Sequence, residues 1–208
     1  PLHLAVSTNN IEGVELLLKE KALLLNQRNK QSLTPLHVAV TNRSIPLIRL
    51  LLSSESINPN IGTMDGATPL HFAAMWGFIE EAKELLNDPR TNPNAPQNES
   101  EFTGATPLHF AAMQAQIEIT KNLLEHKEID IHACIKMGPH KGFTPLHFVV
   151  MNPDTPNVFE TVKLLIKKGA HPLSKSAAGT TPLDLTSVHV VQTLLKNPKL
   201  NYELKPCL

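Results

Sequence analysis

The chain has 208 residues, of which 41% are hydrophobic and 18% are charged, so it can bury a core. It contains no apolar run of the roughly 18 residues that a membrane helix needs. Lysine plus arginine equals aspartate plus glutamate at 19 each, which gives no electrostatic reason to expect nucleic acid or an anionic membrane as partner. The two cysteines, Cys134 and Cys207, make no disulfide framework and favour a reducing, cytoplasmic setting.

In chain order, the dominant feature is one short motif that returns along the whole sequence. Its fullest form is Thr-Pro-Leu-His-x-Ala, and the first copy starts at Pro1 without the threonine. The later copies start at Thr34, Thr68, Thr106, Thr144 and, with aspartate in place of histidine, Thr181. Successive prolines are 34, 34, 38, 38 and 37 residues apart. Six copies in register predict an array of similar structural units.

Each copy of the motif predicts the start of a short helix. Threonine is a typical N-cap, and proline suits the first helical position because it has no N–H to leave unpaired. A second apolar stripe with helical spacing follows in each of the first five units. These stripes include Ile11, Leu47, Ile79, Ile117 and Phe159. In the sixth unit a short join, residues 187–189, precedes a stripe that starts at Val190, which suits a terminal layer.

This motif and its spacing resemble the ankyrin repeat, and the resemblance covers nearly the whole chain. Gly66, which lies two residues before a motif threonine, and Gly77, between two helices, also match that family. The resemblance implies an all-α ankyrin-repeat solenoid, a single domain over residues 1–208 with about six stacked helix-turn-helix units and β-hairpin links. The expected repeats are approximately 1–28, 29–62, 63–100, 101–138, 139–175 and 176–208, with the first repeat incomplete.

The resemblance also implies a function, since proteins of this family bind other proteins on the concave side of the stack. In each unit, the residues that come directly after the apolar core of the first helix should face this groove: Thr41, Asn42, Met75, Trp76, Met113, Gln114, Met151 and Asn152. Tryptophan and methionine are enriched at recognition surfaces, although the same side chains could pack between layers and close the core.

The links between units form a second candidate surface, the fingers. The expected contact positions are Leu33, Asp65, Ala67, Phe102, Thr103, Lys141 and Phe143. Phe102 and Phe143 suit either finger packing or partner contact. Three segments are longer than the family norm: the links over residues 96–102 and 136–141 and the inter-helix loop over residues 151–157. Their length is consistent with a binding role or with plain tolerance of loop insertions.

No sequence motif for catalysis or cofactor binding is present. The repeated histidines are spaced by whole units, too far apart to share a metal ion: His3, His37, His71, His109 and His147. Four further residues match no familiar zinc spacing: His126, His132, Cys134 and His140.

We therefore expect a monomeric, non-enzymatic scaffold that binds a partner protein and uses no cofactor, metal, nucleic acid or membrane. The alternative is that the array is the targeting or substrate-recruiting portion of a larger multidomain enzyme. A related form of this alternative is a secreted bacterial effector that acts in the host-cell cytosol. The start of the chain within a motif, the irregular insertions and the abundance of asparagine and lysine motivate this alternative.

Overall fold

The computed structural model of this chain describes residues 1–20, 24–98 and 101–186, and every regular element in these ranges is a helix. The helices are α1 (Leu2–Ser7), α2 (Ile11–Leu18), α3 (Pro35–Thr41), α4 (Ile45–Leu52), α5 (Pro69–Trp76), α6 (Ile79–Asn87), α7 (Pro107–Met113), α8 (Ile117–Glu125), α9 (Pro145–Met151), α10 (Val158–Lys167) and α11 (Pro182–Leu185). The predicted all-α class is confirmed. The stripe predicted from Val190 lies outside the described residues.

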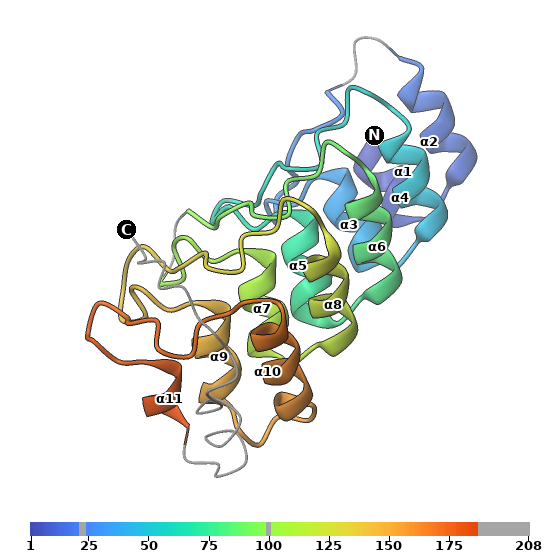
Figure 1. Cartoon of the computed structure of the whole chain (residues 1–208). Coiled ribbons are helices and arrows are strands. Elements are labelled where there is room, and N and C mark those ends of the chain that lie inside the picture. Colours follow the sequence, from blue (N-terminus) through green and yellow to red (C-terminus); the bar gives the residue numbers. More distant parts are fainter. Residues whose placement is uncertain (21–23, 99–100, 187–208) are drawn as a thin grey trace.

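The helices form two parallel rows, which Figure 1 shows side by side with the links projecting to one side. The first helices of successive units stack on one another in the order α1, α3, α5, α7, α9 and α11. The second helices stack in the order α2, α4, α6, α8 and α10. This arrangement confirms the predicted solenoid, in which each layer contacts its sequence neighbours.

From α3 onward, the first helices begin as the motif predicts, with threonine at the N-cap and proline at the first helical position. At α3, Thr34 Oγ1 accepts the N–H of His37 (3.4 Å), while the N–H of Thr34 donates to Nδ1 of His37 (3.2 Å). The motif thus satisfies two backbone N–H groups that a bare helix start would leave unpaired. The same reciprocal capping box is present at Thr68, Thr106, Thr144 and Thr181.

The core is thin and is filled by leucine, isoleucine, valine and alanine. The motif leucines are buried in every complete layer: Leu36, Leu70, Leu108 and Leu146. Fully buried alanines follow them and let the first helices of neighbouring layers approach closely: Ala39, Ala73, Ala74, Ala111 and Ala112. Because each layer is small, this core needs few aromatic residues, which agrees with an aromatic content of only 4%.

The fingers are closed by backbone hydrogen bonds across their bases. Gln97 N–H donates to Ala105 O (2.8 Å), and Ile135 N–H donates to Phe143 O (2.9 Å). Before the motif threonine the chain turns through a positive φ, which is 83° at Gly66 and favours glycine. No strand is assigned within the described ranges, so the expected β-hairpin links are present there as hydrogen-bonded turns.

The motif histidines join each unit to the next one. Nδ1 of His71 lies 2.9 Å from Thr68 Oγ1 in its own cap, and Nε2 lies 3.1 Å from Ala105 O in the following finger. Since Nδ1 accepts the backbone N–H of Thr68, Nε2 carries the proton and donates to the carbonyl. The other Nε2 contacts to the next finger are His3 to Leu33 O, His37 to Ala67 O, His109 to Phe143 O and His147 to Thr180 O.

Asparagine side chains form a second set of bridges at the bases of the fingers. The Nδ2 group of Asn60 donates to Arg90 O (2.6 Å), and its Oδ1 accepts the N–H of Asn92 (2.7 Å). Asn26 and Asn94 make the same pair of hydrogen bonds to their own following units. Each asparagine therefore satisfies one carbonyl and one N–H of the next link, where no helix or strand supplies a partner.

Burial keeps four of the motif histidines neutral. It lowers the pKa of His37, His71 and His147 to about 4 and the pKa of His109 to about 3. In the unfolded chain these rings titrate near pH 6.5. A proton on Nδ1 would also face the N–H of the capping threonine, so the bridge tolerates only the neutral ring.

We expect the free energy of unfolding to fall between pH 6.5 and about pH 4. Above pH 6.5 both states are neutral and the full stability is present; below it the unfolded chain gains protons that the folded chain cannot accept. At pH 5 each of the four histidines should cost about 2 kcal/mol. Urea titrations at pH 7, 6 and 5 measure this effect. His109→Gln should show a shallower pH dependence than wild type, and a constant stability from pH 7 to pH 5 would contradict the assignment.

We expect Leu123→Ala to destabilise the stack by about 2–5 kcal/mol, because this fully buried α8 side chain would leave a cavity. Leu4→Ala is the matched control, since Leu4 is 69% exposed and should change stability by less than about 0.5 kcal/mol. Hydrogen exchange should show lost protection in α7 to α10 and unchanged protection in α1 and α2. A uniform loss along the chain would contradict local coupling.

Candidate functional site

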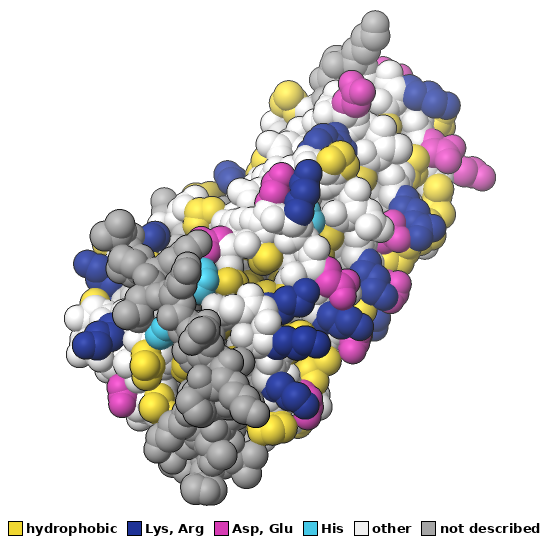
Figure 2. Space-filling model, in the orientation of Figure 1, with side chains coloured by type: hydrophobic (Ala, Val, Ile, Leu, Met, Phe, Trp, Pro, Cys, Tyr) yellow, Lys and Arg dark blue, Asp and Glu magenta, His cyan; other side chains and the backbone are white. Residues whose placement is uncertain are grey.

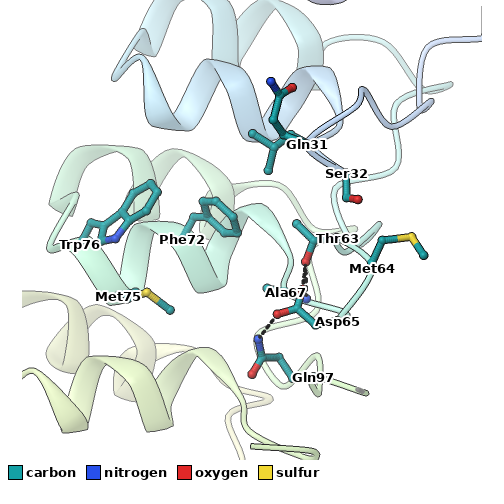
Figure 3. A pocket seen from close by; sticks show the side chains of 11 residues that line it. Gln31, Ser32, Thr63, Met64, Asp65, Ala67, Phe72, Met75, Trp76 and Gln97 are labelled. Atoms are coloured by element: carbon teal, nitrogen blue, oxygen red, sulfur yellow. Dashed lines mark hydrogen bonds between the residues drawn. The ribbon is translucent and has the colours of Figure 1, made fainter. Parts of the chain in front are cut away.

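A pocket opens where α5 meets the fingers of the second and third units. It has a volume of about 400 Å³, and we refer to it as the Trp76 pocket. Its lining residues are Gln31, Ser32, Leu33, Thr63, Met64, Asp65, Ala67, Phe72, Met75, Trp76 and Gln97. Figure 3 shows Phe72 and Trp76 on α5, with Thr63, Met64 and Asp65 across from them on the finger. The structure therefore brings five predicted positions together: Leu33, Asp65, Ala67, Met75 and Trp76.

Trp76 is a large apolar side chain that remains 48% exposed. Its ring contacts Phe72 in a T-shaped arrangement with centroids 5.0 Å apart, and Phe78 in a similar one at 5.7 Å. Arg43 places its guanidinium 5.0 Å from the centre of the Phe78 ring. The indole is thus held in place by neighbouring rings while one part of its surface stays open to solvent.

Asp65 places a carboxylate at the finger side of the same pocket. The hydroxyl of Thr63 donates to Oδ1, and Nε2 of Gln97 donates to Oδ2 (3.3 Å). The backbone is fixed as well, because the N–H of Asn98 donates to Asp65 O (3.0 Å). Asp65 is the only ionisable residue among those that line the pocket, so the pocket carries a negative charge at neutral pH.

The three methionines of the predicted groove differ in exposure. Met75 and Met113 are half-buried and pack against the core, so only part of each side chain is accessible. Met151 is 38% exposed and begins the long loop between α9 and α10, beside a second hollow lined by residues 151–156. The methionines therefore both close the layers and contribute apolar surface, which combines the two roles considered from the sequence.

The polar residues at the ends of the first helices have structural contacts that the sequence reasoning missed. Thr41 Oγ1 donates to Val38 O in its own helix (3.0 Å). Asn42 Nδ2 reaches back to Val6 O at the end of α1 (3.3 Å), and Asn152 Nδ2 reaches Met113 O at the end of α7 (3.5 Å). Gln114 is exposed. The two asparagines therefore tie adjacent first helices together, although both remain on the surface.

Phe102 and Phe143 belong to an aromatic cluster between the two long fingers. Phe143 is only 8% exposed and stacks on His147, with ring centroids 4.8 Å apart. Phe102 is half-buried and stacks on His140 of the next finger at 5.8 Å, with an interplanar angle of 9°. Both rings also pack near Phe148. Both rings take part in finger packing; Phe143 is buried there, while Phe102 keeps part of its surface open, so its partner contact stays a prediction.

Three of the four residues considered for a zinc site make other contacts in the structure: His126, Cys134 and His140. Nδ1 of His126 accepts the N–H of Glu128 (3.3 Å) at the end of α8. His140 lies in the aromatic cluster, and Cys134 is buried with its Sγ 3.9 Å from Nζ of Lys136. The described part of the chain contains no group of three or more His, Cys, Asp or Glu side chains arranged to hold a metal ion.

Several residues of the pocket and of the exposed apolar surface were not found from the sequence. Phe72 lies four residues before Trp76 on the same helix, so helical spacing alone could have paired the two rings. Gln97 gave no such signal, because it comes from the next finger. Exposed apolar residues also occur on the links, where a hydrophobic residue within a polar stretch was the available signal: Leu24, Met64, Met137 and Leu173.

The side formed by the second helices is different in character. Figure 2 shows Lys and Arg side chains interspersed with Asp and Glu side chains along this side. Some of them pair, as Arg49 does with Glu84 (2.6 Å) and Lys83 with Glu80 (2.9 Å). None of the helices in the described ranges is long and apolar enough to cross a membrane. The Trp76 pocket combines apolar exposure with a concave shape, which makes it a candidate binding site.

Comparisons with known proteins agree with this architecture. A family model described as ankyrin repeats (3 copies) matches residues 1–63, 57–134 and 91–176. The crystal structure of EF0377, an ankyrin repeat protein, is similar with a TM-score of 0.77 and 23% identity over 94% of each chain. An ankyrin repeat domain from Acinetobacter baumannii AYE is similar with a TM-score of 0.80 and 22% identity, over 94% of this chain and 95% of that one. No curated protein gave a significant match.

We expect Phe143→Ala and Trp76→Ala to differ clearly in stability. Phe143 is a core side chain, so its removal should cost about 3–5 kcal/mol. Trp76 is half exposed, so its removal should cost about 1 kcal/mol. Urea denaturation followed by circular dichroism measures both values. Equal losses would contradict the division between a packing residue and an open surface residue.

Proposed function

The chain belongs to the ankyrin repeat family, and from this premise we propose that it binds a partner protein through its concave surface and fingers. Ankyrin repeats generally serve as protein–protein interaction modules, and the fold is typically a non-enzymatic scaffold. The proposed contact surface includes the predicted positions that remain accessible in the groove: Thr41, Asn42, Met75, Trp76, Met113, Gln114, Met151 and Asn152.

The observation that carries this proposal is the half-exposed indole of Trp76 in a pocket of about 400 Å³. Exposing so large an apolar surface to water is unfavourable, and burial against a partner recovers this free energy. Tryptophan is also the residue type most often found at binding hot spots, which are surrounded by weaker contacts that exclude water. The half-buried Met75 beside it adds adaptable apolar surface.

The remaining surface supports an interface of ordinary size. A standard interface buries about 800 Å² on each partner, which is more than one pocket supplies. The exposed residues of the first helices and the apolar finger residues Met64 and Met137 extend the accessible surface beyond the pocket. A monomeric state, a cytoplasmic location and a targeting role within a larger protein or effector stay predictions.

We expect a Trp76→Ala/Met113→Ala double variant to lose the partner that the wild-type chain captures. The immobilised chain is exposed to cell lysate, and captured proteins are identified by mass spectrometry and then remeasured with the purified partner. The loss should be at least about tenfold in affinity, because hot-spot truncations cost more than about 1.4 kcal/mol.

The matched control is Lys121→Ala/Lys163→Ala, which changes two exposed residues of second helices and should bind as the wild type does. Circular dichroism confirms that both variants are folded before binding is compared. Unchanged affinity of the folded Trp76→Ala/Met113→Ala variant would exclude the groove as the binding surface.

A further inference from the structure

We propose that the Trp76 pocket binds an arginine side chain of the partner protein. The inference rests on the proposed function, because it names the chemical group that the concave surface would receive. Three features of the pocket support it: its shape, its isolated carboxylate and its aromatic wall (Figure 3).

The shape of the pocket suits one long side chain. Its volume of about 400 Å³ lies at the lower end of the range of ligand pockets. Leu33, Met75 and the two rings on α5 provide apolar surface for a hydrocarbon stem. The carboxylate of Asp65 lies on the finger side, so a side chain that enters along the rings meets the charge with its polar end.

The carboxylate of Asp65 is held in place but not neutralised. Its oxygens accept one hydrogen bond each, from Thr63 and Gln97, and a carboxylate has capacity for about two more. Asp65 forms no ion pair with any residue in the described ranges. Arg28, on the neighbouring finger, donates its Nε to Gly62 O instead (2.7 Å). The pocket therefore lacks a cation that a partner can supply.

The aromatic wall favours a guanidinium over an ammonium group. A flat, weakly hydrated guanidinium stacks on aromatic rings and donates two parallel hydrogen bonds to a carboxylate, whereas an ammonium is compact and strongly hydrated. The molecule already contains such an arrangement next to the pocket. Arg43 lies over the ring of Phe78 while its Nε donates to Glu81 (3.4 Å). We infer that Phe72, Trp76 and Asp65 offer the same combination to an external arginine.

The combination occurs in only one of the layers. The position three residues before the motif threonine is occupied, from the second unit onward, by Gln31, Asp65, Thr103, Lys141 and Ala178. The position seven residues after the motif proline is occupied, in the second to fifth units, by Asn42, Trp76, Gln114 and Asn152. Only in the third unit does an acidic residue at the first of these positions coincide with an aromatic residue at the second. One arginine would therefore fix the register of the partner along the stack.

The test uses Trp76 itself as the reporter, because it is the only tryptophan in the chain. Its fluorescence is followed at pH 7 and constant ionic strength during titration with N-acetyl-arginine amide, N-acetyl-lysine amide and N-acetyl-norleucine amide. We expect a saturable change with the arginine probe and a weaker response to the other two. Asp65→Asn should weaken arginine binding about tenfold, whereas Asp65→Glu, which keeps the charge, should retain most of it.

The matched control is Glu125→Gln, which removes one negative charge from the exposed end of α8 and should bind arginine as the wild type does. Equal responses to arginine and norleucine, equal responses to arginine and lysine, or unchanged binding by Asp65→Asn would overturn the proposal. Capture experiments separate it from the proposed function. If Asp65→Asn retains a partner that Trp76→Ala/Met113→Ala loses, the groove binds a protein but not through an arginine.

Discussion

The structure depends on one repeated interaction, the bridge from the motif histidine to the backbone of the following finger. From His37 to His147, each bridged ring accepts from the capping threonine with Nδ1 and donates to the next unit with Nε2. One side chain thereby starts a helix and joins two layers. Because both nitrogens are used and the ring is buried, only the neutral form fits. Asp184 occupies the histidine position in the last described copy of the motif. Its carboxylate accepts the two hydrogen bonds of the cap, but it has no N–H to donate to a following unit.

The bridges leave other positions free to vary without loss of the fold. The asparagine bridges at the finger bases and the small residues between first helices repeat in the same register. Residues at the ends of the first helices differ from unit to unit, and some of them, such as Asn42 and Asn152, make contacts of their own. The long fingers illustrate this freedom, since their added residues form an aromatic cluster in which Phe102 stacks on His140.

The Trp76 pocket is formed by residues at variable positions of the repeat, which the repeated framework holds in place. The framework of α5 and its neighbouring fingers determines where the side chains at these positions lie, and the third unit places an indole and a carboxylate there. Asp65 is oriented by Thr63 from its own finger and by Gln97 from the next, so two layers together build one site. A repeat array can in this way carry a specific site while most of each unit serves the stack.

The sequence alone determined the helix starts from Thr34 onward and the solenoid class, because these depend on local capping and on a motif that repeats at a nearly constant interval. It also indicated Trp76 and Met75 as groove residues, since their place in the repeat is regular. Only the tertiary structure decided how the variable positions are used. It buried Phe143 against His147, engaged Asn42 and Asn152 in bridges between helices, and brought Gln97 to Asp65. The contacts of Asn42, Asn152 and Gln97 join residues 32 to 39 positions apart, so no local pattern in the sequence records them.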